Sequence, residues 1–494
     1  MSKYTVAIDL GCSDIVVAVG TKDADGKLNV VDVALKPLND GVVKGEISNI
    51  ENVTKTLRTT LNETEQRLGI NIDEAYASIS GQHIQSATSS YFVYVGNDGE
   101  VREEDVRKLK DNMDNVQPPE ESMVIMERIP QSYTIDNHEQ TTSPIGRFGR
   151  QLGATFNFIV ANKSSIDRNQ KVFDRVGIRR KGLFAAPLAS SLAVATEDEK
   201  ELGVVVVDLG AGTTSVCIWS YNVLRHVAVI PMGMNVINKD IRSASIPDLH
   251  IEDLKVAHGY AVASAIPDNL INKTINIPGR TKHEVKQITF RDLSTIIEAR
   301  VLDIIEYVIG EIKDAGMAEK VASGIVLTGG GSLLKGIDTL FEERTGYDVR
   351  LASADFNISD ESKEFVSDPR LATATGVLLM AQNPELLAAQ SQQKSTDNEG
   401  FSYTAKTNNP VEVQNPDFTD SEQEDSYEED SFFEESSSNT KRKPRKEPKE
   451  RKKRDKKKKN TNNEEGGESN LKRKISEIFN QLFGVIDDDD ESFN

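Results

Sequence analysis

The stretches VAIDLGCSDIVVAVG (residues 6–20) and VVVVDLGAGTTSVCIW (residues 204–219) decide the fold of this chain. Each places the tripeptide Asp-Leu-Gly between two apolar runs, which is typical of a β-hairpin with a glycine-containing turn. Glycines in such a turn let backbone N–H groups approach a phosphate, and the hydroxyls of Ser13, Thr213 and Thr214 add further donors. One such tripeptide is usually an ordinary turn. Two in matching contexts predict a duplicated phosphate-binding fold.

A third glycine-rich segment, GIVLTGGGSLLKG, occupies residues 324–336 and leads from an apolar strand into a predicted helix. Taken alone, it reads more simply as a strand-to-helix connection that needs positive φ. The order of two phosphate loops and one glycine-rich adenosine loop resembles the superfamily of actin, heat-shock chaperone ATPases and sugar kinases. That resemblance implies ATP as the ligand. Asp9 and Asp208, each at the end of a strand, are then the candidates to hold a hydrated Mg²⁺.

Composition and charge narrow the remaining classes of protein. The 494 residues carry a net charge of -20, which argues against a general nucleic-acid binder. The two cysteines, Cys12 and Cys217, suggest no disulfide framework, so a reducing cytosol is the expected compartment. The six histidines lack metal-ligand spacing, so no zinc or iron site is expected. The sequence contains no stretch of about 18 apolar residues, so no membrane-spanning helix is predicted.

The composition changes sharply after residue 384. Residues 390–470 are rich in Ser, Glu, Asp, Lys, Asn and Gln, and we interpret them as a disordered tether. Within this tether, residues 412–435 hold 11 acids and no Lys or Arg, and residues 441–459 hold 14 basic residues against three acids. A flexible chain of this length has an r.m.s. span of ~50 Å, so it could connect a surface to a body well away from it.

The segment SNLKRKISEIFNQLFGVI (residues 469–486) predicts an amphipathic helix. Its apolar face comprises Leu471, Ile475, Ile478, Phe479, Leu482, Phe483 and Ile486. Lys472, Arg473 and Lys474 oppose the helix dipole but suit anionic lipid headgroups. The arrangement is that of an in-plane membrane anchor on a long tether. The alternative is a helix that docks into this protein's own core or into a partner's groove. The acids at 487–494 would have to point away from a membrane.

The remaining motifs resemble one family closely, the actin-like bacterial division proteins of the FtsA family. The resemblance rests on the two hairpins and the glycine-rich segment together with GLFAAPLASSLAVATEDEKELG (182–203), HVAVIPMGMNVINKDI (226–241), AHGYA (257–261) and TATGVLL (373–379). It covers about 380 residues, and the terminal helix fits it. The implied fold is α/β: an actin-like ATPase fold of two RNase H-like domains around a nucleotide cleft. An inserted 1C subdomain, a disordered C-terminal linker and a terminal amphipathic helix complete it.

The resemblance also implies how the chain is divided. Subdomain 1A takes residues 1–83 and 163–202, the 1C-type insertion 84–162, subdomain 2A residues 203–242, subdomain 2B residues 243–309, and residues 310–384 complete 2A and return to 1A. Residues 385–468 form the linker, 469–486 the membrane-targeting helix and 487–494 an acidic tail. Within the insertion, SYFVYV, MVIMERIP and ATFNFIVAN are strand candidates and EEDVRKLKDNM is a helix candidate.

Nucleotide contacts carry over from the family to particular residues. They are Gly11, Cys12, Ser13 and Asp14 in the first loop, Gly210, Ala211, Gly212, Thr213 and Thr214 in the second, Gly329, Gly330, Gly331 and Ser332 in the third, and Gly233, Asn235, Glu298 and Arg300 elsewhere in the cleft. The chain departs from the family pattern in two places. Ala186 stands before Pro187 where many relatives carry Glu, and Cys12 and Asp14 replace more usual Thr or Ser and Lys. Because alanine cannot orient a water molecule, ATP binding is expected with weak or absent hydrolysis.

The function implied by the resemblance is a cell division adaptor. It would self-associate into actin-like filaments and hold FtsZ to the cytoplasmic face of the inner membrane at the division septum. The C-terminal peptide of FtsZ would bind subdomain 2B, where Arg280, Lys282, Lys286 and Arg291 provide positive charge, although a solvated surface explains these four about as well. Other division proteins are candidate partners of the 1C-type insertion, and nucleic acid is not expected. The alternatives are a cell-shape or pilus-assembly scaffold, or a sugar-kinase or chaperone-type ATPase.

Overall fold

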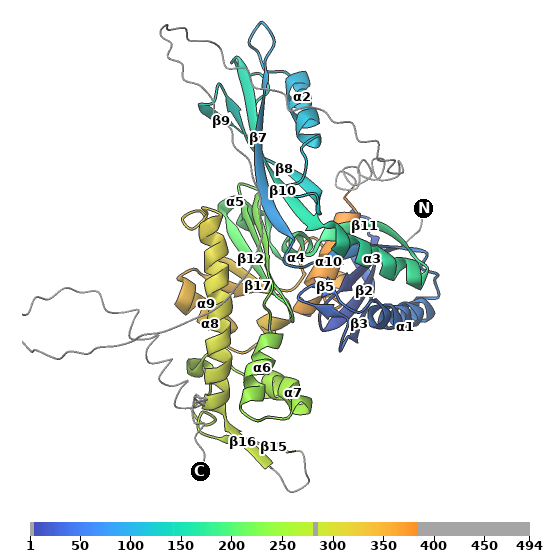
Figure 1. Cartoon of the computed structure of the whole chain (residues 1–494), viewed down its shortest axis with the longest axis vertical. Helices are drawn as coiled ribbons and strands as arrows, with labels where there is room; N and C mark the ends of the chain where they lie inside the picture. Colours follow the sequence, from blue (N-terminus) through green and yellow to red (C-terminus); the bar gives the residue numbers. More distant parts are fainter. Residues whose placement is uncertain (1–3, 142, 280–284, 384–494) are drawn as a thin grey trace, which may run out of the picture. The chain divides into compact units, whose positions relative to one another are not determined.

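The computed structural model describes residues 4–141, 143–279 and 285–383. The predicted linker, amphipathic helix and acidic tail at 385–494 lie outside the described residues. No helix among the described residues is long and apolar enough to cross a membrane. The described part is a mixed α/β structure built around two sheets, and Figure 1 shows the elements coloured along the chain.

The first predicted hairpin forms the centre of a five-stranded sheet. Its order is β11-β6-β1-β2-β3, with strands β1 (Thr5–Leu10), β2 (Asp14–Lys22), β3 (Leu28–Pro37), β6 (Glu74–Ile79) and β11 (Arg179–Ala185). Strands β1 and β2 are antiparallel, and Leu10 opposite Ile15 closes the turn, whereas β6 runs parallel to β1. Helices α1 (Ile50–Leu68) and α3 (Lys163–Val176) bury their apolar stripes on this sheet, where Ile8, Leu57 and Phe173 pack together. A short hairpin, β4 (Val42–Val43) with β5 (Glu46–Ile47), precedes α1.

The second predicted hairpin belongs to a nine-stranded sheet. Its order is β18-β17-β12-β13-β14-β7-β10-β8-β9, and its first five strands are β18 (Val349–Leu351), β17 (Ile325–Thr328), β12 (Val204–Leu209), β13 (Thr214–Ser220) and β14 (Val223–Ile230). Strands β12 and β13 are antiparallel, as predicted, and β17 lies parallel to β12. Helices α8 (Phe290–Asp314) and α9 (Ile337–Thr345) pack against this part of the sheet, and α6 (Asn235–Ser243) and α7 (Asp248–His258) contribute to the same apolar core.

The inserted segment supplies the other four strands of that sheet. They are β7 (Gln85–Tyr94), β8 (Met123–Ile135), β9 (Glu139–Thr141) and β10 (Gln151–Asn162), with helix α2 (Glu103–Asp114) packed on one face. The three strand candidates and the helix candidate read from the sequence are all present. Although the insertion interrupts the chain of the first domain, it joins the sheet of the second, because Gln85 of β7 pairs with Ala228 of β14.

Smaller elements complete the described chain. A two-stranded hairpin, β15 (Thr274–Pro278) with β16 (Val285–Thr289), leads into α8. Helix α5 (Glu197–Leu202) begins with a capping box in which Thr196 and Glu199 satisfy each other's backbone N–H groups. Single 3-10 turns lie at Ala263–Ala265, Gly330–Leu333, Asp360–Ser362 and Pro369–Leu371. Helix α8 continues through residue 309, where the sequence placed a subdomain boundary.

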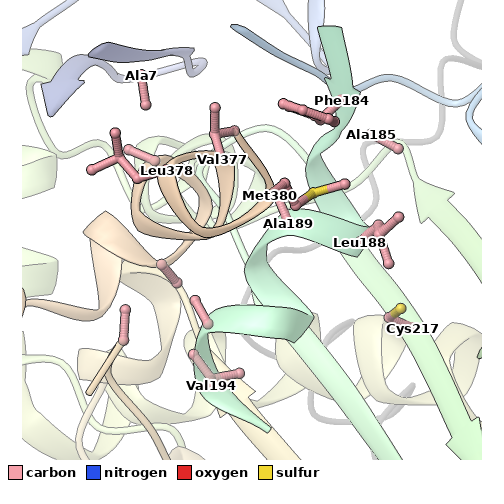
Figure 2. Close-up of a cluster of buried hydrophobic side chains, with 14 of the residues drawn as sticks. Ala7, Phe184, Ala185, Leu188, Ala189, Val194, Cys217, Val377, Leu378 and Met380 are labelled. Atoms are coloured by element: carbon pink, nitrogen blue, oxygen red, sulfur yellow. The ribbon is translucent and has the colours of Figure 1, made fainter. Parts of the chain in front are cut away.

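Two short helices, α4 (Ala186–Val194) and α10 (Ala372–Ala381), form the core between the two sheets. Figure 2 shows their apolar side chains, with Val377 and Leu378 from α10 and Leu188 from α4, in one buried cluster. The helices approach so closely that a Cβ atom on Gly376 would lie 1.8 Å from the carbonyl oxygen of Ala189. Glycine is therefore required at this position by packing of backbone against backbone.

Candidate nucleotide-binding site

A cavity of about 1210 Å³ lies where the two predicted phosphate turns face each other. Its lining includes Asp9, Gly11, Cys12, Ser13, Asp14, Asp208, Gly210, Ala211, Gly212, Thr213, Asn235, Gly329, Gly330 and Gly331 from the sequence-based set. The structure thus brings together residues from three separate segments of the chain. The volume exceeds the roughly 300–1,000 Å³ of typical small-molecule sites, so a nucleotide fits without filling it.

The first turn is closed by its own backbone and braced by a cysteine. The N–H of Gly11 donates to the carbonyl of Asp14 at 3.0 Å. The N–H of Gly45 donates to the Cys12 thiol sulfur at 3.2 Å, which ties the β4–β5 hairpin to the turn. Burial raises the pKa of the Cys12 thiol. Asp14 accepts a hydrogen bond from the Ser13 hydroxyl at 2.8 Å, so its carboxylate already has a partner beside the cavity.

The second turn is held from below by the start of α6. The Gly210 N–H donates to the carbonyl of Thr213 at 2.9 Å, and Asn235 N–H donates to the carbonyl of Ala211 at 2.8 Å. Gly233 does not line the cavity, but a Cβ atom there would come within 2.5 Å of the Gly210 oxygen. Thr214 is buried beneath the turn. Gly233 and Thr214 therefore shape the turn and do not lie on its open side.

The third segment combines both sequence interpretations. Gly329 has φ of 79°, and a Cβ atom there would lie 2.2 Å from a carboxylate oxygen of Asp208, so the strand-to-helix connection does need glycine. Gly331 packs against Leu209 in the same way. The hydroxyl of Ser332 donates to the Gly329 carbonyl at 2.7 Å and holds the loop closed. Gly329, Gly330 and Gly331 nevertheless line the cavity, with bare backbone toward it.

Two carboxylates, one from each hairpin, occupy the cavity. Asp9 accepts a hydrogen bond from Ser78, and its burial, with the charges of Asp208 and Asp14 nearby, raises its pKa to about 6. Asp208 accepts a hydrogen bond from Thr373 of α10 at 3.2 Å, and burial raises its pKa as well. Two buried carboxylates that resist ionisation form a site that gains stability when a cation binds.

The comparisons with known proteins agree on one family. The family model described as cell division protein FtsA matches residues 205–376, and the model described as the SHS2 domain inserted in FtsA matches residues 81–160. Cell division protein FtsA of Pseudomonas aeruginosa is 31% identical over 404 residues, covering 82% of this chain and 94% of its own length. The chain belongs to the FtsA family. FtsA of Escherichia coli K12 is 30% identical over 384 residues, covering 76% of this chain and 90% of its own length.

A solved structure supports the actin-like fold of this FtsA-family chain. The PilM-PilN type IV pilus biogenesis complex superposes with a TM-score of 0.53 at 14% identity, covering 77% of this chain and 99% of the matched chain. The predicted α/β, actin-like fold with an inserted subdomain is confirmed. The insertion predicted at 84–162 corresponds to the SHS2 match at 81–160.

Like Thr214, Gly233 and Ser332, Glu298 and Arg300 were carried over from the FtsA family and do not line the cavity. Arg300 is paired with Asp240 at 2.7 Å and with Asp303 at 2.8 Å. Glu298 accepts a hydrogen bond from the backbone of Ala263, and burial raises its pKa. Both side chains make their contacts within the part of the chain formed by Ala263, α6 and α8.

A different acid and base, both on α7, line the cavity in place of Glu298 and Arg300. Lys255 of α7 is buried, and its Nζ lies 2.8 Å from Glu252 and 2.9 Å from Asn238. Glu252, Lys255 and Asn238 all line the cavity, as does Thr373. Sequence reasoning missed them because an acid and a lysine three residues apart on a helix usually form a surface pair. The available signal was the AHGYA motif (257–261), which begins two residues after Lys255 and spans the end of α7.

Other predicted site residues are only partly described. Ala186, at the start of α4, lines the cavity. Lys286 lies on β16 and Arg291 at the start of α8, whereas Arg280 and Lys282 lie outside the described residues. The predicted membrane-facing residues 471–486 also lie outside them.

Proposed function

We propose that this chain is an ATP-binding, actin-like division protein that self-associates and anchors FtsZ filaments to the cytoplasmic membrane. One observation carries the proposal: a chain of the FtsA family has a cavity bounded by two Asp-Gly turns and a glycine-rich loop. The amphipathic periodicity of residues 471–486 supports the membrane part.

The residues present fit a magnesium nucleotide. Backbone N–H groups of the two turns would bind phosphate oxygens, because glycine leaves them uncovered. Asp9 and Asp208 would hold Mg²⁺, which neutralises phosphate charge when bound. Glu252 and Lys255 would bind the sugar, as a carboxylate accepts from hydroxyl groups and an ammonium donates to them.

Hydrolysis is proposed to be weak. The side chain of Ala186 supplies neither a hydrogen-bond donor nor an acceptor at the cavity wall. A nucleotide that persists would act mainly as a structural or polymerisation switch, because a ligand stabilises the conformation that it prefers.

Nucleotide binding should protect one of the two cysteines from alkylation. Cys12 lines the cavity, whereas Cys217 is buried and its burial raises its pKa to about 12. We expect a maleimide at pH 8 to label Cys12 alone, and Mg-ATP to slow that labelling at least ~10-fold. Intact-protein mass spectrometry with peptide mapping measures the rate, and Cys12→Ser is the control for site identity. Labelling at the same rate with and without saturating Mg-ATP would contradict the proposed site.

Removing residues 469–494 should abolish membrane binding but leave binding of the FtsZ peptide intact. Full-length protein should float with anionic vesicles and carry a fluorescent FtsZ C-terminal peptide with it. A chain that ends at residue 468 should stay in the dense fraction yet bind the peptide with unchanged affinity by fluorescence anisotropy. Replacing Phe479 and Phe483 by serine in the full chain is the matched control, since it removes apolar area but no charge. If the truncated chain floats as well as the full chain, residues 469–494 are not the membrane anchor. If neither chain binds the peptide, the proposed recruitment of FtsZ is wrong.

A further inference from the structure

Strand β7 has an open edge within the described part of the chain. One side of β7 pairs with β10 along its whole length, from Gln85 to Tyr94. On its other side, the pairing with β14 is confined to Gln85 opposite Ala228. The Val227 N–H donates to the Ser86 hydroxyl at 2.7 Å, and beyond this point β14 contacts β10 instead, where Asn157 donates to the Arg225 carbonyl at 2.9 Å. From residue 87 to 94, the outer edge of β7 pairs with no described strand.

This edge lacks the usual protection against pairing with another chain. The sequence QSATSSYFVYVGN, residues 85–97, contains no charged residue and no proline. Both edges of the five-stranded sheet are protected. Strand β11 carries Arg179 and Lys181. Strand β3 carries Lys36, and its edge is covered because the Ser359 N–H donates to the Leu28 carbonyl and the Val30 N–H donates to the Ser362 hydroxyl. An exposed strand edge without charge, proline or cover is a template for strand addition.

Aromatic side chains gather along the same strand. Tyr91, Phe92 and Tyr94 are 47%, 47% and 75% exposed. The Phe92 ring lies 5.6 Å from that of Tyr94 and 6.2 Å from that of Tyr91, so they form one aromatic cluster. In Figure 1, β7 runs beside β10 within the inserted segment and extends away from α4 and α10. The open edge therefore combines unpaired backbone with apolar area, and both favour a pairing strand.

We propose that β7 pairs antiparallel with β7 of a second copy of this chain. An identical strand is the occupant that the charge pattern favours, because two uncharged edges meet without like-charge repulsion. A two-fold antiparallel pair also satisfies both open edges in one contact and closes the assembly as a dimer. The pairing joins the two nine-stranded sheets into one continuous sheet.

The symmetry fixes which residues meet. In a two-fold pair, residues at equal distances from the centre lie opposite each other, and the central residue faces its own copy. With the open stretch at 87–94, the centre falls at Ser89, Ser90 or Tyr91. A centre at Ser90 places Phe92 opposite Thr88 of the second copy, and aromatic side chains opposite β-branched ones stabilise a sheet.

Cysteine scanning in the full chain tests this pairing. Five single variants carry cysteine at Thr88, Ser89, Ser90, Tyr91 and Phe92, and the wild-type cysteines give the background. Opposed residues have Cβ atoms about 4.5–5.5 Å apart, close to the spacing of a disulfide. A residue two positions from the centre lies about 13 Å from its own copy. We expect one variant among Ser89→Cys, Ser90→Cys and Tyr91→Cys to give at least ~10-fold more oxidised dimer than the variants two positions away.

Charge on the edge provides the matched test. Adding Phe92→Lys and Tyr94→Lys to the cross-linking variant should lower the dimer yield at least ~10-fold, whereas Tyr307→Lys, on the exposed face of α8, should not change it. Equal yields at all five positions, no dimer above wild type, or a yield indifferent to the two lysines would overturn the proposal. If the scan gives no dimer but the two lysines abolish binding of another division protein, β7 takes a partner's strand and the two-copy pairing is wrong. Nucleotide and vesicle binding should be unchanged throughout, so this result stands apart from the proposed function.

Discussion

The Gly376→Ala variant should have a much lower free energy of unfolding than the wild-type chain. The added methyl would lie 1.8 Å from the Ala189 carbonyl oxygen, and both groups belong to buried helices, α4 and α10. Overpacking a core usually costs about 1–3 kcal/mol, and here the obstacle is backbone that cannot change rotamer. We therefore expect a loss at or above the upper end of that range. Thermal and urea unfolding followed by circular dichroism measure it.

A second helical glycine provides the control for this substitution. A Cβ atom on Gly310, within α8, would meet no heavy atom within 4 Å. Gly310→Ala should then gain about 1 kcal/mol from helix propensity alone. The two variants make the same chemical change in two helices and are expected to differ in sign. A Gly376→Ala protein as stable as wild type would show that α4 and α10 separate easily.

The Asp9→Asn variant should make the nucleotide-free protein more stable at pH 7 and remove its response to Mg-ATP. The pKa of Asp9 is about 6 in the folded chain, above the ordinary value of 3.8. The folded state therefore holds the proton more tightly than the unfolded state. The stabilisation is fully present below about pH 4 and is lost as the pH rises through about 6. The difference amounts to at most about 3 kcal/mol, and water in the cavity reduces it.

The asparagine variant keeps the hydrogen bond from Ser78 without a charge to bury. Without ligand, the melting temperature of the variant should change less between pH 4 and 7 than that of wild type. At pH 7, the variant should melt at a higher temperature than wild type. Wild type at 100 times the dissociation constant should gain about 2.7 kcal/mol from Mg-ATP, whereas the variant should gain little. Asp25→Asn, at an exposed turn, is the control and should follow wild type in both measurements. A variant that retains the full gain would show that Asp9 does not act in cation binding.

The sequence predicted the individual strands and helices better than the contacts between them. Both hairpins, the glycine-rich connection and the strands of the insertion could be read locally, because each rests on apolar alternation and turn residues. The role of Gly376 could not, since TATGVLL reads as a helix with one weak helix former. Only the approach of α4 makes that glycine obligatory.

The cavity wall was the least predictable part of the candidate site. Glu298 and Arg300 lie in a helix whose charged positions look alike in sequence, and the pairing of Arg300 with Asp240 depends on contact between α8 and α6. The AHGYA motif marks the chain near Lys255, but only the packing of α7 against α6 places the Lys255 side chain at the cavity wall. Long-range packing decides which face of a helix meets a ligand, and periodicity alone does not contain that information.

The inserted segment is connected through the chain to the elements of the five-stranded sheet, but its hydrogen bonds join it to the nine-stranded sheet. Its two ends leave β6 and enter α3, both on the five-stranded sheet, whereas Gln85 pairs with β14 and Gln131 donates to the Leu224 carbonyl at 2.8 Å. Any rotation that widens the cavity must therefore bend this cross-brace or break its hydrogen bonds to β14. We therefore expect a rotation at the ligand to be transmitted along β7 to its far end, where the aromatic cluster lies.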